Sequence, residues 1–242
     1  MDDLIDLLKT SDHCVFLSGA GVSTFSGIPD FRGESGLYTK YDADRIFSLD
    51  DFHDDPSYFY HYSKDLVYNL NEREPGLIHN VLAQMEKQGI VKAVITQNID
   101  MLHQKAGSVN VIEIHGSPAI HHCLHCSREY SYENIADIVQ LDQIPRCDDC
   151  GGLIKPDIIF YGEMLDRETL AAAIQEASEA DVLVVIGSSL VVQPAASLPL
   201  YTLDNGGKLV IVNNMPTPLD RYAHLRYDDL EDVFHHIEKE LL

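Results

Sequence analysis

Short, uninterrupted apolar runs alternate with longer amphipathic stretches along this chain. Such runs are typical of strands buried on both faces of a parallel sheet, whereas apolar residues spaced three or four apart indicate helices. Strands are predicted at residues 14–18, 91–96, 111–115, 157–160, 181–186 and 207–212. Helices are predicted at residues 4–8, 76–88, 166–180 and 231–242. The alternation predicts an α/β fold with a doubly wound parallel sheet.

Two segments interrupt this alternation. Residues 34–75 are rich in Tyr, Phe, His and Asp and have no strand pattern, so we expect a helical insertion of short helices and loops that covers a cleft. Residues 117–155 carry paired cysteines and are expected to form a zinc-binding module. The sequence therefore predicts a Rossmann-like domain made of residues 1–33, 76–116 and 156–242, and a smaller domain formed by the two interrupting segments.

Four of the five cysteines occur as two Cys-x-x-Cys pairs, Cys123/Cys126 and Cys147/Cys150. The 20 residues between the pairs suit one tetrahedral zinc site. In a reducing compartment such pairs bind metal more often than they form disulfides. Four thiolates leave no open position for water, so the zinc is predicted to be structural. The fifth cysteine, Cys14, lies in an apolar run and is expected to be a buried core thiol.

The composition narrows the class of partner. The chain has 242 residues, of which 45% are hydrophobic, so a sizeable core is expected. Its formal net charge of -22 should repel nucleic acid and anionic membranes and attract cationic partners such as lysine-rich peptides, although acidity that only aids solubility is the simpler interpretation. No apolar run approaches the ~20 residues that span a bilayer, and the N-terminus has no signal-peptide pattern, so a cytoplasmic protein is expected.

The first predicted strand runs into a glycine-rich turn, Gly19-Ala20-Gly21, and Ser23 is positioned to cap a short helix after it. Such a turn lets the backbone approach a pyrophosphate, and the helix offers free N–H groups to an anion. Thr24 stands where a dinucleotide-binding fingerprint usually has its third glycine, and no acidic residue marks a strand end about 20 residues later. These departures disfavour an ordinary hydride-transfer dehydrogenase.

Further motifs follow in a fixed order along the chain. They are residues 19–33, Thr96-Gln97-Asn98-Ile99-Asp100, His115-Gly116-Ser117, the two cysteine pairs, residues 156–163, residues 187–192 and Val212-Asn213. On these motifs, from about residue 12 to residue 215, the chain resembles the sirtuin family of NAD-dependent protein deacylases, in its short bacterial or archaeal form. The resemblance implies a protein-lysine deacetylase that uses NAD as co-substrate, contains a structural zinc, and releases nicotinamide and O-acetyl-ADP-ribose.

The resemblance also implies roles for individual residues. His115 would act as general base on a ribose hydroxyl, and Asn98 and Asp100 would line the nicotinamide pocket, so these three form the predicted catalytic set. Phe31 would shield the reactive ribose carbon from water, and Arg32 would anchor a loop near the phosphates. The predicted NAD-binding residues are Gly19, Ala20, Gly21, Ser23, Thr24, Asp30, Phe31, Arg32, Gln97, Asn98, Ile99, Asp100, Gly187, Ser188, Ser189 and Asn213, with an adenine-side contact from the backbone around residues 227–230.

The acyl-lysine protein or peptide is expected to bind as an added strand, whose main-chain hydrogen bonds tolerate many sequences. The predicted substrate-binding residues are Ile158, Ile159, Phe160, Tyr161, Gly162, Glu163, Leu190, Val191 and Val192. Tyr161 stands where the family pattern has Phe, which leaves the acyl-chain preference open. Relatives that remove succinyl groups carry a Tyr-x-x-Arg pair, but here Tyr60 is followed by Ser63, which implies a neutral acyl group such as acetyl.

Two other functions fit part of the same pattern. A mono-ADP-ribosyltransferase would pass the ribose carbon to a protein nucleophile, and a NAD-sensing binding module would hold NAD without releasing nicotinamide. The complete set of Asn98, Asp100 and His115 favours deacylation, because a pure binding module needs no general base.

Overall fold

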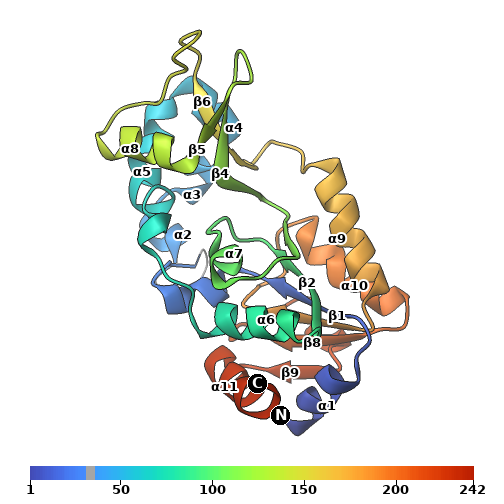
Figure 1. The fold of residues 1–242 in the computed structure, drawn as a ribbon. Coiled ribbons are helices and arrows are strands. Elements are labelled where there is room, and N and C mark those ends of the chain that lie inside the picture. Colours follow the sequence, from blue (N-terminus) through green and yellow to red (C-terminus); the bar gives the residue numbers. More distant parts are fainter. Residues whose placement is uncertain (31–35) are drawn as a thin grey trace.

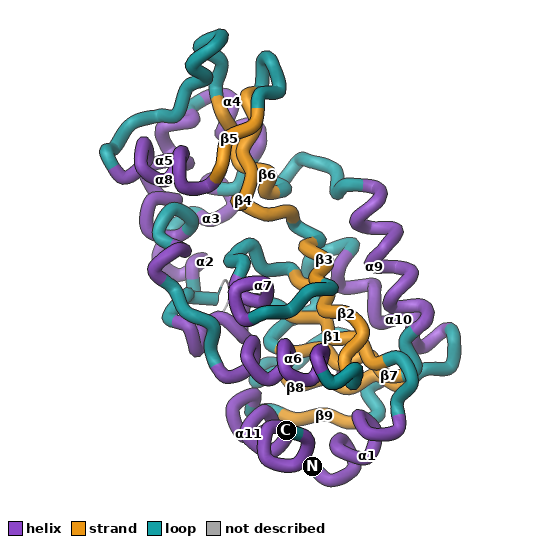
Figure 2. Tube along the Cα trace, viewed as in Figure 1, coloured by secondary structure: helices purple, strands orange, loops and turns teal. Residues whose placement is uncertain are grey.

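The computed structural model describes residues 1–30 and 36–242. Within these residues the strands fall into two separate groups, shown in orange in Figure 2. The larger group is a six-stranded parallel sheet in the order β3-β2-β1-β7-β8-β9. Its strands are β1 (Cys14–Ser18), β2 (Val91–Thr96), β3 (Val111–Glu113), β7 (Val182–Ile186), β8 (Lys208–Val212) and β9 (Leu225–Tyr227). This is the strand order of a doubly wound sheet, and the predicted fold class is confirmed.

Helices cover both faces of the large sheet (Figure 1). Along β1, Phe16 packs into the core on one face, while Val15 and Leu17 pack into the core on the other. The first face is covered by α1 (Asp2–Thr10), α6 (Leu77–Lys87) and α11 (Leu230–Leu241), and the second by α9 (Arg167–Glu179) and α10 (Leu198–Asp204). Burial on both faces explains why these strands are continuous apolar runs in the sequence.

The smaller sheet is antiparallel, in the order β5-β4-β6. Its strands are β4 (Gly116–Cys123), β5 (Glu129–Ser131) and β6 (Ile154–Ile158). The helices that belong to this part of the molecule are α2 (Leu37–Lys40), α3 (Ala43–Ile46), α4 (Leu49–Asp54), α5 (Pro56–Leu66) and α8 (Tyr132–Gln140). Aromatic rings form its core: the ring centroids of Phe52 and Phe59 lie 5.4 and 5.0 Å from that of Phe160. The helical insertion and the cysteine-bearing segment therefore share one hydrophobic core.

The remaining helices of the described residues are short. They are α7 (Leu102–Ala106) and the 3-10 helices η1 (Ala20–Ser26), η2 (Leu70–Glu72), η3 (Ala195–Ser197) and η4 (Asp220–Tyr222). Helices α9 and α11 begin at side-chain caps: Asp166 accepts a hydrogen bond from the backbone N–H of Thr169 at 2.8 Å, and Asp229 accepts one from that of Asp232 at 2.9 Å. Across the described ranges, no helix combines the length and apolarity that a membrane crossing requires.

The structure differs from the predicted elements mainly around the smaller sheet. The strand predicted at residues 111–115 ends at Glu113, because the chain turns at residues 114–115 to enter β4. The strand predicted at residues 157–160 is shifted to Ile154–Ile158, where it pairs with β4. Strand β4 was not predicted because its exposed and buried residues do not alternate regularly, and β9 was not predicted because it is only three residues long. The residue boundaries of the two domains stay a prediction.

Candidate functional site

The carboxyl ends of β1 and β7 mark the point where the order of the large sheet reverses direction. Open α/β sheets bind ligands at such a point, in the crevice outside the strand ends. The two loops that leave these strands touch through their backbones: a Cβ atom on Gly19 would lie 2.7 Å from the carbonyl oxygen of Gly187. Gly187 has φ of +59°, a conformation that favours glycine. The two glycines thus let the loops meet side by side and leave the space above them open.

A cavity of about 820 Å³ lies at this point, between the strand ends of the large sheet and segments of the smaller part. The predicted residues that line it are Gly19, Ala20, Gly21, Ser23, Thr24, Asp30, Gln97, Asn98, Ile99, Asp100, His115, Ile158, Ile159, Phe160, Tyr161, Gly162, Glu163, Gly187, Ser188, Ser189, Val192 and Asn213. Phe31 and Arg32 lie outside the described residues. The structure thus brings most of the predicted set, from loops far apart in the sequence, to one cavity.

Three polar side chains are bonded to one another in the wall of this cavity. The hydroxyl of Ser23 donates to a carboxylate oxygen of Asp100 at 2.5 Å, and the amide of Asn98 donates to the same hydroxyl at 3.1 Å. The second carboxylate oxygen of Asp100 accepts from the backbone N–H of Leu102 at 3.0 Å. Asn98 and Asp100 are both buried. Their side chains are therefore held in fixed orientations before any ligand binds.

A second pair of contacts joins the loops on either side of the glycines. The side-chain amide of Gln97 donates to the hydroxyl of Ser188 at 2.8 Å. Asn213, at the end of β8, is buried and donates to the carbonyl oxygen of Met215 at 2.8 Å. Asp228 and Asp229 also line the cavity, close to where the sequence predicted an adenine-side backbone contact. These polar groups suit a ligand with many hydroxyl and phosphate oxygens, such as a dinucleotide.

His115 lies in the turn between β3 and β4 and lines the cavity. Its Nδ1 lies 3.0 Å from the carbonyl oxygen of Gln97. A carbonyl only accepts, so Nδ1 carries the hydrogen and Nε2 keeps its lone pair in the neutral ring. Burial lowers the pKa of His115, and the hydrogen bond to Gln97 opposes that shift. At neutral pH the ring is therefore a neutral base whose Nε2 can accept a proton.

Behind the cavity wall lies a buried hydrogen-bond chain that sequence reasoning gave no role. The Nε2 atom of His103 lies 2.9 Å from the hydroxyl of Ser18, which donates to the hydroxyl of Thr96 at 2.8 Å. The Thr96 hydroxyl in turn accepts from the backbone N–H of Asn98 at 3.1 Å. Burial, with His79 as a neighbour, lowers the pKa of His103 to about 3. Only the tertiary structure reveals this chain of hydrogen bonds.

The other end of the cavity is apolar. It is lined by Phe47, Leu66 and Val67 from the helical insertion, by Ile158 at the end of β6 and by Phe160 just after it. The insertion residues were not predicted, because they lie in a segment without a regular hydrophobic pattern.

Two predicted substrate-binding residues do not line the cavity. Leu190 is buried and packs into the core beside the large sheet, and its backbone has a φ of +52°. Val191 is 48% exposed and lies at the protein surface. Only Val192 of this predicted segment reaches the cavity wall.

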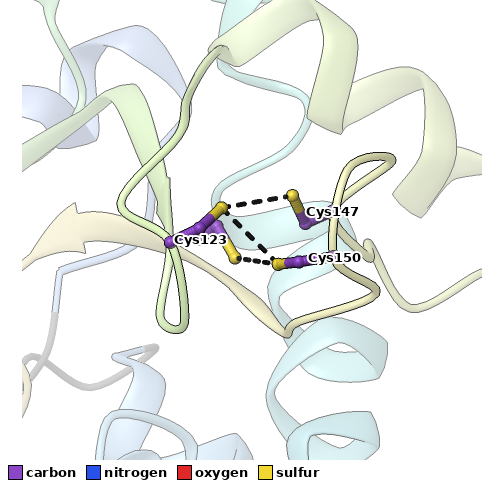
Figure 3. A group of neighbouring side chains, drawn as sticks. Cys123, Cys147 and Cys150 are labelled. Atoms are coloured by element: carbon purple, nitrogen blue, oxygen red, sulfur yellow. Dashed lines mark hydrogen bonds between the residues drawn. The ribbon is translucent and has the colours of Figure 1, made fainter.

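The four paired cysteines converge at the end of the smaller sheet. Figure 3 shows Cys123, Cys147 and Cys150 turned toward one another from two loops. The sulfur atoms of all four cysteines lie within 4.8 Å of one another, and three of the separations are 3.5, 3.6 and 3.5 Å. Four sulfurs at ~2.3 Å from a zinc ion form a tetrahedron with edges of ~3.8 Å. The geometry and the soft donor set therefore fit a structural zinc site.

The surroundings of Cys147 favour the metal-binding form of the thiol. The hydroxyl of Tyr130 donates to its sulfur at 3.1 Å, and this hydrogen bond lowers the pKa of Cys147 to about 6. Zinc binds thiolate rather than thiol, so the lowered pKa favours the metal-binding form of Cys147.

Together these features define a class of protein. A doubly wound sheet, a cavity at its switch point, a neutral base in that cavity and an inserted four-cysteine metal site are the parts of a nucleotide-dependent enzyme. Residues 19–194 match the model of the Sir2 family. The chain belongs to the Sir2 family.

Individual relatives agree with this assignment over almost the whole chain. An NAD-dependent protein deacetylase of Thermotoga maritima is 47% identical over 94% of this chain and 92% of its own length. An NAD-dependent protein deacylase 2 of Archaeoglobus fulgidus is 45% identical over 89% of this chain and 85% of its own length. A solved structure of a Sir2 variant with a deacetylated p53 peptide and 3'-O-acetyl ADP-ribose has a TM-score of 0.93 and 45% identity, and covers 99% of this chain and 96% of its own.

Proposed function

We propose that this chain is an NAD-dependent protein-lysine deacetylase that releases nicotinamide and O-acetyl-ADP-ribose. The observation that carries the proposal is the position of His115, a neutral base in one cavity that is polar at one end and apolar at the other. The names of the relatives and the acetyl-ADP-ribose in one related structure support it. The reaction needs a dinucleotide at the polar end and an acyl-lysine at the apolar end.

The polar end suits NAD. Gly19 and Gly187 leave room for its phosphates, Gln97, Ser188 and Asn213 offer side-chain groups to its ribose and phosphate oxygens, and Asp228 lies at the adenine side. NAD, when bound, supplies a ribose carbon whose bond to nicotinamide breaks, so that nicotinamide leaves and the acyl oxygen of the substrate bonds to that carbon. The protein side chains bind the reactants, orient them and accept the proton. Side chains that are oriented in advance lower the reaction barrier.

Asn98 and Asp100 would hold nicotinamide, with the Asp100 carboxylate accepting from the carboxamide. Their orientation is supported by the hydrogen bonds through Ser23. His115 would take a proton from a ribose hydroxyl at Nε2, while Nδ1 stays bonded to Gln97. The lowered pKa of His115 keeps the ring neutral, and so active as a base, throughout the physiological pH range.

The apolar end suits the acyl-lysine side chain. Ile158, Phe160 and Phe47 offer it a hydrocarbon channel, and the peptide backbone would add as a strand beside Gly162 and Val192. Strand addition reads main-chain groups, so we expect loose sequence specificity among acyl-lysine proteins.

A neutral acyl group fits this channel better than a charged one. Ser63 is fully buried and does not line the cavity, and Tyr60 donates its hydroxyl to the carbonyl of Ile154. The ammonium of Lys64 is bonded to Asp142 at 2.8 Å on the surface. The described residues of the helical insertion bring no cation to the cavity, and the arginine that does line it, Arg167, stands at the start of α9. Acetyl or another neutral acyl group is therefore the proposed substrate.

We place the protein in the cytoplasm, where reducing conditions keep four metal-binding cysteines as thiols. Immunodetection in fractionated cells tests this location, and recovery in an exported fraction would contradict it.

Nicotinamide release tests the function directly. We expect the native protein to release nicotinamide from NAD only with an acetyl-lysine peptide, with matching deacetylation, and His115→Ala to lower the rate by roughly 10² to 10⁴ fold, as loss of a general base does. His53→Ala, at an exposed histidine of α4, is the matched control and should keep full activity.

Mass spectrometry of the peptide separates the alternatives. Gain of ADP-ribose in place of acetyl loss would indicate a mono-ADP-ribosyltransferase, and NAD binding without nicotinamide release would indicate a binding module. Either result would overturn the proposal.

A further inference from the structure

Lys155, on β6, is a lysine with a buried side chain that none of the proposed roles uses. Only 7% of its side chain is exposed. Lysine is rarely buried, since removing an ammonium from water is costly unless every N–H finds an acceptor. Burial lowers the pKa of Lys155, and the nearby carboxylate of Glu163 opposes that shift. A buried cation of this kind calls for a function of its own.

The acceptors of this ammonium all come from the segment that follows it. Its three N–H groups donate to the carbonyl oxygen of Ile158 at 2.7 Å, to that of Pro156 at 3.2 Å and to a carboxylate oxygen of Glu163 at 2.8 Å. The ammonium also lies 4.1 Å from the centre of the Phe160 ring. The side chain is thus fully satisfied by a loop that wraps around it.

The same loop forms the apolar wall of the cavity and is tied to the proposed base. The carboxylate of Glu163 accepts from the backbone N–H of Phe160 at 2.7 Å. Ile159 lies between Ile158, which accepts from Lys155, and Phe160, which donates to Glu163. The backbone N–H of Ile159 donates to the carbonyl oxygen of His115 at 2.9 Å. Lys155 and Glu163 therefore fix the backbone on both sides of the residue that contacts His115.

We propose that Lys155 is a positioning residue for the acyl-lysine substrate, acting through the loop at residues 158–163. This inference rests on the proposed function. The ammonium sets where the Ile158 carbonyl and the Phe160 ring lie, and so sets the width of the channel that receives the acyl-lysine side chain. Glu163 pairs with the ammonium and accepts from the Phe160 N–H, and it lies in the segment beside which the peptide strand is expected to add. We call Lys155 and Glu163 the clamp.

A packing role alone would not need a charge here. A buried ion pair contributes little to stability compared with hydrophobic residues of the same volume, because desolvation offsets the attraction. The pair instead selects one conformation of the loop, because the ammonium makes three hydrogen bonds to acceptors at fixed positions. Removing one partner alone leaves the other charge unpaired and lowers stability as well. Weaker substrate binding in the folded variant is therefore the consequence that a role in positioning predicts.

Steady-state kinetics of Lys155→Met tests this inference, because methionine keeps the length of the apolar stem without the ammonium. We expect the KM for an acetyl-lysine peptide to rise about tenfold, since charge-assisted hydrogen bonds are worth more than a tenfold change in binding. The kcat at saturating peptide should stay within about threefold, and the affinity for NAD alone should be unchanged. Lys208→Met, at the exposed start of β8, is the matched control and should change none of these values.

A second variant keeps the test decisive if Lys155→Met does not fold. Glu163→Gln still offers an oxygen to the Phe160 N–H but removes the ion pair, and we expect its peptide KM to rise about threefold. A peptide KM equal to that of the native protein in a folded variant would overturn the inference, as would a lower kcat with unchanged KM. If the native protein itself fails to deacetylate any peptide, it is the proposed function that fails, because the comparison of variants then has no reference rate.

Discussion

The two ends of the cavity are built in different ways. At the polar end, side chains hold one another: Ser23 joins Asp100 to Asn98, and Gln97 bonds to Ser188. At the apolar end, few side chains bond to each other, and the loop with Phe160 is held by backbone contacts and by the clamp of Lys155. The polar end is thus set by groups that a sequence motif can specify, and the apolar end by contacts between distant segments.

The two ends also depend on different parts of the fold. The polar end sits on strand ends of the six-stranded sheet, whose cores on both faces are filled by aliphatic residues and Phe16 and Phe234. The apolar end depends on the aromatic core of the smaller part, which includes Cys123 and Cys147. Perturbing the smaller part should therefore disable peptide binding and leave NAD binding intact.

Removal of a metal ligand is the strongest way to separate the ends. Cys147→Ser should release the zinc, whose binding supplies about 10 kcal/mol or more of folding free energy in small zinc domains. We expect peptide binding to be lost while NAD binding remains, measured by calorimetric titration of each ligand alongside the metal content. Cys14→Ala, outside the cluster, should keep one zinc per chain. Equal loss of NAD binding in Cys147→Ser would show that the two ends are one cooperative unit.

Truncation of the central aromatic ring should have the next largest effect. Phe160 is 1% exposed and contacts Phe47, Phe52 and Phe59, so Phe160→Ala should cost about 3 to 5 kcal/mol of unfolding free energy. Urea unfolding followed by aromatic circular dichroism measures this cost. The 71%-exposed Leu141 supplies the comparison, because Leu141→Ala should cost far less. A cost below about 1 kcal/mol for Phe160→Ala would contradict the assignment of this ring to the core.

Acid pH should lower the unfolding free energy through a buried histidine behind the polar end, and this effect is smaller than that of Phe160→Ala. The pKa of His103 is lowered to about 3 in the folded protein, against about 6.5 when unfolded, so the unfolded chain takes up the proton first. The stabilising contribution is fully present above pH 6.5 and is lost as the pH falls toward 3. Between pH 7 and pH 5 the loss is about 2 kcal/mol from this residue, and His79, whose pKa burial also lowers, adds to it in the same direction.

Unfolding experiments at the two pH values check this contribution. We expect the difference in unfolding free energy between pH 7 and pH 5 to be about 2 kcal/mol smaller in His103→Gln than in the native protein, since glutamine does not titrate. His224→Gln, in the loop before β9, is the matched control for the loss of one histidine. An unchanged pH dependence in His103→Gln would show that protonation of this ring is not what lowers the unfolding free energy in acid.

Much of the fold and of the polar end follows from the sequence. The strands of the large sheet that flank the cavity are continuous apolar runs, because burial on both faces demands them, and they were predicted close to their observed bounds. Asn98, Asp100 and His115 stand directly after strands, so parallel pairing brings them to one edge. The four cysteines follow from their spacing, since a tetrahedral zinc ion takes four ligands and two Cys-x-x-Cys pairs supply them.

The tertiary structure alone decided the apolar end. Phe47 and Val67 reach the cavity from a segment without periodicity, and Leu190 turned out to be a core residue rather than a wall residue. Lys155 and His103 have partners that lie outside any local pattern. A motif records side chains that must carry particular chemistry, whereas the packing of an apolar wall depends on shape, and many sequences can produce the same shape. The catalytic residues could therefore be predicted from the sequence. The residues that line the channel for the substrate could be identified only in the tertiary structure.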